Sequence, residues 1–301
     1  FEVANQLLLK NLAYKCFHNS DYIKNNSSNR NKFQSKWRDT PTKHHPKNQE
    51  FSIRLKTPKN GICQINDKVQ GNIKVNYEEI DDYIILRSDG SPTFLLSSAV
   101  DDHDMKVSDI IRGDDHLTNS FRQKVIFDFL DYKPNFAHIS LIHNENNQKL
   151  SKRDNAPSIL EYKNNGYLPI SINNYLIRLG WSFGDKEIFS MEEVEKIFSL
   201  DNIGKSASKH DKKKLDFLNN YYLKITDDNV LLNLLRKRKD FKDLDKKFNE
   251  KNIYLINLFK DRANNLCDII KNINKFSLEH REFNDEEKEL IEPLIKNKDL
   301  I

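Results

Sequence analysis

A regular alternation of short apolar segments constrains the fold of this chain more than any other feature. Residues 107–111 and 135–142 are short apolar stretches, and residues 117–130 between them have the apolar spacing of a helix. Parallel strands are buried on both faces and need such a helical crossover between them. The apolar run at residues 92–100, which we interpret as a further buried strand, fits the same rhythm. The sequence therefore predicts an α/β fold with a parallel sheet.

The segments on either side have a different character. Residues 1–14 have helical spacing, and residues 19–50 are rich in Asn, Ser, Lys and His, which predicts a loop region with short helices. Short strands in a small mixed region are expected at residues 51–55, 62–69, 72–75 and 83–86, and helices at residues 158–164, 170–179, 191–198 and 212–222. From residue 227 to the end, further amphipathic helices rich in lysine are expected.

Cysteine and charge content restrict the class of protein. Cys16, Cys63 and Cys267 are odd in number and widely spaced, which argues against a disulfide framework and indicates a reducing compartment. Cys16 and His18 have the only metal-like spacing, and no second pair follows, so no metal site and no zinc are expected. The net charge of +4 permits nucleic-acid binding without requiring it. With no signal peptide and no apolar run long enough for a bilayer, no membrane association is expected.

The pentapeptide KLSKR at residues 149–153 is the first candidate site. It follows the strand predicted at 135–142 and a polar turn. Such a sequence is often only a solvated basic turn. After a sheet strand, however, a lysine loop can close over a triphosphate, and its ammonium groups can neutralise charge that develops on the phosphorus. Both interpretations stay open on the pentapeptide alone.

The second candidate site is RGDDH at residues 112–116, directly after the strand predicted at 107–111. Asp115 could simply cap the helix that starts near Leu117. However, ligands bind at the carboxyl ends of strands in α/β sheets, and Arg112 there offers a planar fork for a carboxylate. Asp114 or Asp115 could hold a ribose hydroxyl or an amino group. The polar run at residues 101–104 is expected to follow a buried strand and to fix loop geometry.

Taken together, these motifs closely resemble the bacterial-type glutamyl-tRNA synthetases, a family of class I aminoacyl-tRNA synthetases. The matches occur in the same order over roughly residues 50 to 225, which makes the resemblance more specific than any single motif. The matching stretches are residues 86–94, 100–105, 110–117, 149–153, 166–169, 174–176, 179–182 and 214–219.

The resemblance implies a fold and a domain order. It implies an α/β protein with a partial Rossmann-like class I catalytic domain and an inserted α+β acceptor-binding domain, followed by all-α stem-contact and anticodon-binding regions. The bounds we predict are 1–90 for the inserted domain, 91–145 for the second half of the catalytic domain, 146–225 for the lysine loop and stem-contact region, and 226–301 for the start of the anticodon-binding domain.

The resemblance also implies a reaction: ATP-dependent activation of L-glutamate and transfer of the glutamyl group to tRNA(Glu). KLSKR is a variant of the KMSKS signature, with Lys152 as its second lysine and Lys149 and Lys152 as the catalytic residues. The implied ATP-binding residues are Lys149, Leu150, Ser151, Lys152, Arg153 and Asp115, and the implied glutamate-binding residues are Phe94, Ser98 and Arg112. ATP with Mg²⁺ and tRNA(Glu) are the expected cofactor and partner, and we expect a monomer in the cytoplasm, with an organelle as the alternative.

Three features depart from the family pattern. The chain begins at Phe1 inside an amphipathic pattern without the family's His-Ile-Gly-His-like motif, so we expect an N-terminally incomplete sequence that is inactive by itself. Phe94 stands where the family usually has tyrosine, which removes one hydrogen-bonding hydroxyl, worth about 0.5–1.5 kcal/mol. Ser35 to Arg38 stand where a zinc-binding relative would have its later cysteine.

Other functions remain to be separated from this one. A non-catalytic RNA-binding remnant of the same fold, a glutaminyl-type synthetase and a generic nucleotidyltransferase are the alternatives. The basic run at residues 236–239 could contact tRNA phosphates or could be a solvated helix face, and the charge pattern favours neither.

Overall fold

The computed structural model describes residues 1–18, 35–150 and 157–276. The chain forms two compact units. Unit 1 comprises Phe1–Leu150, Arg178–Lys186 and Val194–His210, and unit 2 comprises Ser151–Ile177, Glu187–Glu193 and Asp211–Ile301. Each unit is described by itself below.

Unit 1 begins with a small antiparallel sheet in the order β1 (Ala13–Cys16), β2 (Ser52–Leu55), β5 (Ile84–Leu86). Helix α1 (Glu2–Leu9) buries Ala4 and Leu7. The helix predicted over residues 1–14 is therefore too long. Asn11 has φ 57°, which ends the helical course, and the following residues pair with β2 instead. Short 3₁₀ helices η1 (Lys36–Arg38) and η2 (Thr42–His44) confirm the short helices expected in the polar region.

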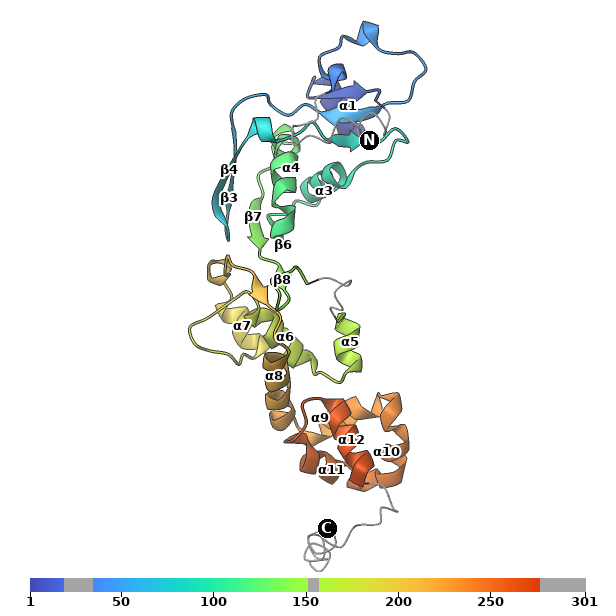
Figure 1. The fold of residues 1–301 in the computed structure, drawn as a ribbon, viewed down its shortest axis with the longest axis vertical. Helices are drawn as coiled ribbons and strands as arrows, with labels where there is room; N and C mark the ends of the chain where they lie inside the picture. Colours follow the sequence, from blue (N-terminus) through green and yellow to red (C-terminus); the bar gives the residue numbers. More distant parts are fainter. Residues whose placement is uncertain (19–34, 151–156, 277–301) are drawn as a thin grey trace, which may run out of the picture. The chain divides into compact units, whose positions relative to one another are not determined.

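The second sheet of unit 1 contains the predicted parallel strands. Its order is β4 (Gly71–Asn76), β3 (Ile62–Asp67), β7 (Asn135–Ile139), β6 (Asp109–Gly113). Strands β6 and β7 are parallel, and α4 (Leu117–Phe129) connects them, which confirms the predicted strand–helix–strand pattern. The β3–β4 hairpin joins this sheet through a parallel contact of β3 with β7. Figure 1 shows α3 and α4 beside this part of the unit.

The strand predicted for the apolar run at residues 92–100 is wrong, because most of this run lies in helix α3 (Phe94–Asp104). Leu96 and Ala99 are buried, with Leu95 and Val100 packed on the same core, so the buried positions follow helical and not strand spacing. The hydroxyl of Thr93 donates to the carbonyl of Ile84 at 2.9 Å and fixes the start of the helix. The polar residues at 101–104 consequently form the end of a helix and do not follow a strand.

Unit 1 is completed by η3 (Tyr77–Glu79), η4 (Asp114–His116), and a two-stranded parallel pair of β8 (Ile142–His143) and β9 (Ser208–Lys209). Residues 200–202 form the 3₁₀ helix η6 (Leu200–Asn202). The core is continuous from the small sheet to α3, α4 and the parallel strands. The predicted domain bounds at residues 90 and 145 stay predictions.

Unit 2 contains only helices among its described residues, as predicted for this half of the chain (Figure 1). Helix α6 begins in unit 2 and ends at the first residue of a unit 1 segment, and α7 is likewise shared between the units. The helices are α5 (Ile159–Asn164), α6 (Pro169–Arg178), α7 (Met191–Ile197), α8 (Lys212–Ile225), α9 (Asp228–Arg236), η7 (Lys239–Phe241), α10 (Lys242–Phe248), η8 (Asn249–Lys251), α11 (Asn252–Lys260) and α12 (Leu266–Phe276). Their shared core combines leucines and isoleucines of α9, α11 and α12 with Leu168 and Tyr222.

Candidate functional site

The segment after β6 places the first group of candidate residues. The strand ends at Gly113, η4 follows, and α4 begins at Leu117. A Cβ on Gly113 would lie 2.6 Å from Oδ1 of Asp115, so this position suits a residue without a side chain. His116 and not Asp115 is the N-cap residue of α4, and its side chain makes no capping hydrogen bond. The side chain of Asp115 is thereby left for another contact.

Asp115 binds the first lysine of the KLSKR pentapeptide. Nζ of Lys149 donates to Oδ2 of Asp115 at 2.6 Å, and both side chains are substantially exposed. This hydrogen bond holds the pKa of Asp115 below its ordinary value, against a small opposing effect of burial. The backbone N–H of Leu150 donates to the carbonyl of Ile142 at 2.8 Å, which attaches the start of the pentapeptide to β8. The structure thus brings together Lys149 and Asp115, two predicted ATP-binding residues.

The remaining residues of the pentapeptide, Ser151, Lys152 and Arg153, lie outside the described residues. The predicted polar turn before it is present, since Asn144 accepts hydrogen bonds from the backbone of Asn146 and Gln148 at 3.0 and 2.9 Å. This turn orients the chain so that Lys149 follows directly on an ordered hairpin.

Arg112 lies in β6 and is held by uncharged acceptors. Its Nη2 donates to Oγ of Ser120 at 2.5 Å and to Oε1 of Gln123 at 3.0 Å, and its Nε donates to Nε2 of His138 at 3.3 Å. Burial lowers the pKa of Arg112, and the charge of Asp102 opposes this shift. Among the residues that the structure describes, no carboxylate lies within ion-pair distance of Arg112. Within the described residues, the guanidinium is therefore fixed in place without a carboxylate partner.

Gln123 links Arg112 to a second predicted glutamate-binding residue. Its Nε2 donates to Oγ of Ser98 at 2.6 Å while its Oε1 accepts from Arg112. Ser98 lies one helical turn after Phe94 on α3, so the two residues share a helix face. Phe94 is 54% exposed, and its ring centroid lies 5.9 Å from that of His116. The structure thus connects all three predicted glutamate-binding residues to one end of β6 and the start of α4.

Sequence reasoning missed Ser120 and Gln123. Both are buried and lie three residues apart on α4, hence on one face of the helix. The available signal was the presence of two polar residues on the apolar face of a helix that follows the RGDDH segment. Polar residues there need partners, because a buried polar group without a hydrogen bond is costly.

Cys16 has the environment of a structural residue. It is fully buried, and its Sγ lies 3.6 Å from Oγ of Ser35, the first residue of the segment 35–38 in which a zinc-binding relative is expected to have its later cysteine. Residues 1–18, 35–150 and 157–276 contain no cluster of three or more His, Cys, Asp or Glu side chains suited to a metal ion.

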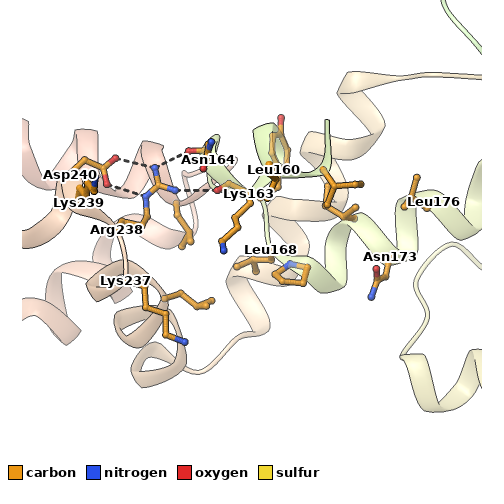
Figure 2. Close-up of a pocket in the computed structure, with 16 residues that line it drawn as sticks. Leu160, Lys163, Asn164, Leu168, Asn173, Leu176, Lys237, Arg238, Lys239 and Asp240 are labelled. Atoms are coloured by element: carbon orange, nitrogen blue, oxygen red, sulfur yellow. Dashed lines mark hydrogen bonds and ion pairs between the residues drawn. The ribbon is translucent and has the colours of Figure 1, made fainter. Parts of the chain in front are cut away.

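Unit 2 has a cavity of about 1000 Å³ between α5, α6, η7 and the start of α12. Figure 2 shows Arg238 at its wall, bound to Asp240 and to the carbonyls of Lys163 and Asn164, with Nη2 2.9 Å from the carbonyl oxygen of Asn164. Arg236 likewise binds Asp245 at 3.0 Å. The two arginines of the basic run at 236–239 therefore tie the helices together, which leaves its lysines as the candidates for phosphate contacts.

No helix in the described part of the chain has the length and apolar character that a bilayer crossing requires.

Known proteins similar to this chain point to one family. The family model described as tRNA synthetases class I (E and Q), catalytic domain, matches residues 1–217. The chain is 48% identical over 244 residues to the glutamate–tRNA ligase 2 of Ehrlichia chaffeensis, covering 78% of this chain and 51% of that protein. It is 42% identical over 285 residues to the glutamate–tRNA ligase of Nitrobacter winogradskyi, covering 90% of this chain and 60% of that protein.

The fold agrees with these matches. The crystal structure of the glutamate-tRNA synthetase from Elizabethkingia anophelis superposes with a TM-score of 0.81 at 26% identity, covering 97% of this chain and 68% of that chain. This chain spans between half and three fifths of the length of the two ligases named above. The chain belongs to the family of class I tRNA synthetases for glutamate and glutamine (E and Q), and the predicted α/β class I architecture is confirmed.

Proposed function

We propose that this chain is part of a glutamate–tRNA ligase, which activates L-glutamate with ATP and transfers the glutamyl group to tRNA(Glu). The observation that carries the proposal is the environment of Arg112. A guanidinium fixed by Ser120, Gln123 and His138, with no carboxylate partner among the described residues, is suited to the carboxylate of an acidic amino acid. Phe94 and Ser98, on the same helix, would line the amino-acid site beside it.

The proposed first step is in-line attack of a glutamate α-carboxylate oxygen on the α-phosphorus of ATP. The new carboxyl oxygen–phosphorus bond forms as the bond to the bridging oxygen breaks, which gives glutamyl-adenylate and pyrophosphate. In such reactions the protein contributes mainly positioning and charge neutralisation. We assign neutralisation of the triphosphate to Lys152 and Lys149, with Leu150, Ser151, Arg153 and Asp115 completing the nucleotide site and Mg²⁺ bound to the phosphates.

In the second step a hydroxyl of the terminal ribose of the tRNA attacks the glutamyl carbonyl carbon. The ester bond forms, AMP leaves, and the hydroxyl proton is released. We propose that residues 1–90 contact the acceptor arm, that residues 146–225 contact the stem, and that residues 226–301 begin the anticodon-binding domain. A monomer acting in the cytoplasm is the expected form.

The test is amino-acid-dependent exchange of labelled pyrophosphate into ATP by the complete protein, with tRNA present. Glutamate should support exchange and aminoacylation of tRNA(Glu). Exchange with glutamine alone would indicate the glutaminyl-type enzyme, and tRNA binding without any exchange would indicate the non-catalytic remnant. Lys152→Ala should slow activation by about 100-fold, the scale on which groups that stabilise transition-state charge act.

Lys133→Ala is the matched control, because Lys133 is exposed and lies outside the proposed site. Pyrophosphate exchange by Lys152→Ala at the parent rate would refute the assigned role of Lys152. It would not affect the amino-acid specificity, which the comparison of glutamate with glutamine tests.

A further inference from the structure

A buried hydrogen-bond chain crosses the second sheet of unit 1 and ends at Arg112. Asp67 ends β3, His138 lies in β7, and Arg112 lies in β6, so the chain runs across three neighbouring strands. Arg112 and His138 are direct partners in the parallel pairing of β6 with β7. The side chains of Asp67 and His138 are fully buried. None of the reaction steps assigned above uses either residue.

Both oxygens of Asp67 accept from the backbone N–H of His138 at 3.1 Å, and each has further partners of its own. Oδ1 accepts from the backbone N–H groups of Val69 and Gln70 at 2.9 and 2.8 Å, which fixes the turn after β3. Oδ2 lies 2.6 Å from Nδ1 of His138. Burial alone would raise the pKa of Asp67, but these hydrogen bonds outweigh it and the pKa is lowered. Asp67 is therefore a carboxylate that can only accept at His138.

The hydrogen-bond partners of Nε2 of His138 determine which ring nitrogen carries the proton. Nε2 accepts from Nε of Arg112 at 3.3 Å and lies 2.9 Å from Oγ of Ser120. An arginine Nε–H can only donate, so Nε2 must carry a lone pair, and the ring proton lies on Nδ1 facing Asp67. Ser120 accepts from Nη2 of Arg112 and can donate its own proton to Nε2. All partners of the ring are consistent with one neutral tautomer.

We propose that Asp67 and His138 are positioning residues for the amino-acid site. Asp67 holds His138 in the Nδ1–H tautomer, and Nε2 of His138 then fixes Nε of Arg112, which sets the plane of the guanidinium. With Nη2 engaged by Ser120 and Gln123, Nη1 has no hydrogen-bond partner among the described residues and is the nitrogen left to meet the substrate carboxylate. This inference rests on the proposed function, because it assigns the carboxylate that Arg112 binds to glutamate.

The Asp67→Asn variant separates positioning from turn formation. Oδ1 of an asparagine at this place keeps the hydrogen bonds from Val69 and Gln70, so the turn is retained. Its Nδ2 faces Nδ1 of His138 and can only donate, so the ring proton must move to Nε2. Nε2 then presents a donor to the donor of Arg112, and the guanidinium loses its fixed plane.

The control is Asp82→Asn. Asp82 is a second buried carboxylate of unit 1 that accepts from Arg38 and from the backbone N–H of Thr57, with no contact to Arg112. It should lower stability without changing the KM for glutamate. Both variants are made in the complete protein and are measured below their unfolding temperatures.

Two readouts decide the proposal. Two-bond ¹H–¹⁵N correlation of the histidine rings should show His138 protonated on Nδ1 in the parent and on Nε2 in Asp67→Asn. In glutamate-dependent pyrophosphate exchange with tRNA present, Asp67→Asn should raise the KM for glutamate by about 10- to 100-fold, the range known for outer partners of metal-binding residues, with the KM for ATP unchanged.

The parent and variant results separate the two claims. A parent protein without glutamate-dependent exchange refutes the proposed function, whereas the ring tautomer still tests the hydrogen-bond chain. A parent His138 protonated on Nε2 overturns the positioning role, even if Asp67→Asn does not fold. A folded Asp67→Asn protein with a switched tautomer and an unchanged KM for glutamate overturns it as well, as does an equal rise in the KM for glutamate in Asp82→Asn.

Discussion

Replacement of Gly166 by alanine should destabilise unit 2 through two separable effects. Gly166 joins α5 to α6 with φ +82°, a left-handed conformation that costs an L-residue about 1–2 kcal/mol. A Cβ there would also lie 2.8 Å from the backbone nitrogen of Cys267 and 2.9 Å from that of Leu266. Leu266 begins α12 and donates its backbone N–H to the carbonyl of Gly166 at 2.9 Å.

The new Cβ must therefore move the start of α12 away and break that hydrogen bond. Leaving the N–H of Leu266 unpaired costs about 1–3 kcal/mol. The sum is about 2–5 kcal/mol, a large fraction of a typical domain stability of about 5–15 kcal/mol. Gly90 is the matched control, because it also has φ +82° but a Cβ at this position would meet no atom within 4 Å. Gly90→Ala should cost only the conformational part, about 1–2 kcal/mol.

Hydrogen–deuterium exchange read by peptide can follow the two sites separately. Since each 1.4 kcal/mol is a factor of ten, Gly166→Ala should accelerate exchange of the buried amides of α12 by at least about 30-fold. Gly90→Ala should leave α12 unchanged. Parent-like exchange of α12 in Gly166→Ala, or an equal loss of urea stability in both variants, would refute the steric part of the reasoning.

Four further predictions concern the proposed site. Phe94→Tyr restores a hydroxyl on an exposed ring and should lower the KM for glutamate by about 2- to 12-fold, equivalent to one hydrogen bond of about 0.5–1.5 kcal/mol; a raised KM would contradict a glutamate-facing ring. Lys149→Ala should raise the KM for ATP. If Asp115 acts only by holding Lys149, the double variant with Asp115→Asn should have the same KM for ATP as Lys149→Ala. Additive effects on the KM would show an independent role of Asp115. The lowered pKa of Asp115 keeps that ion pair intact at neutral pH, and its contribution should disappear only as the pH falls through that lowered pKa, observable by carboxyl NMR titration. Arg112→Lys keeps the charge but loses the planar group that His138, Ser120 and Gln123 hold, so the kcat/KM for glutamate should fall by about 10-fold or more while the KM for ATP stays constant; an unchanged kcat/KM would contradict a role for the fixed Nη1.

The sequence predicted the parallel pair of β6 and β7 with α4 between them because each segment has strong local character. Five-residue apolar strands and a thirteen-residue helix can be recognised from spacing alone. The sequence-based prediction was wrong at α3, where a strand was expected. Residues 92–100 would be apolar on more than one side of a helix, and periodicity does not distinguish such a run from a buried strand. The choice was made by packing, since Leu96 and Ala99 face the core formed with β5 and α4.

The candidate site shows the same division. By itself the sequence determined which chemical groups stand near strand ends, because their order along the chain is local. These groups are an arginine and two carboxylates at the end of β6 and a lysine-rich pentapeptide after β8. Only the tertiary structure decided their partners. The hydrogen bond of Lys149 to Asp115 and the chain from Asp67 through His138 to Arg112 join residues more than 25 positions apart, and such pairings depend on strand order and burial, which a single sequence does not encode locally.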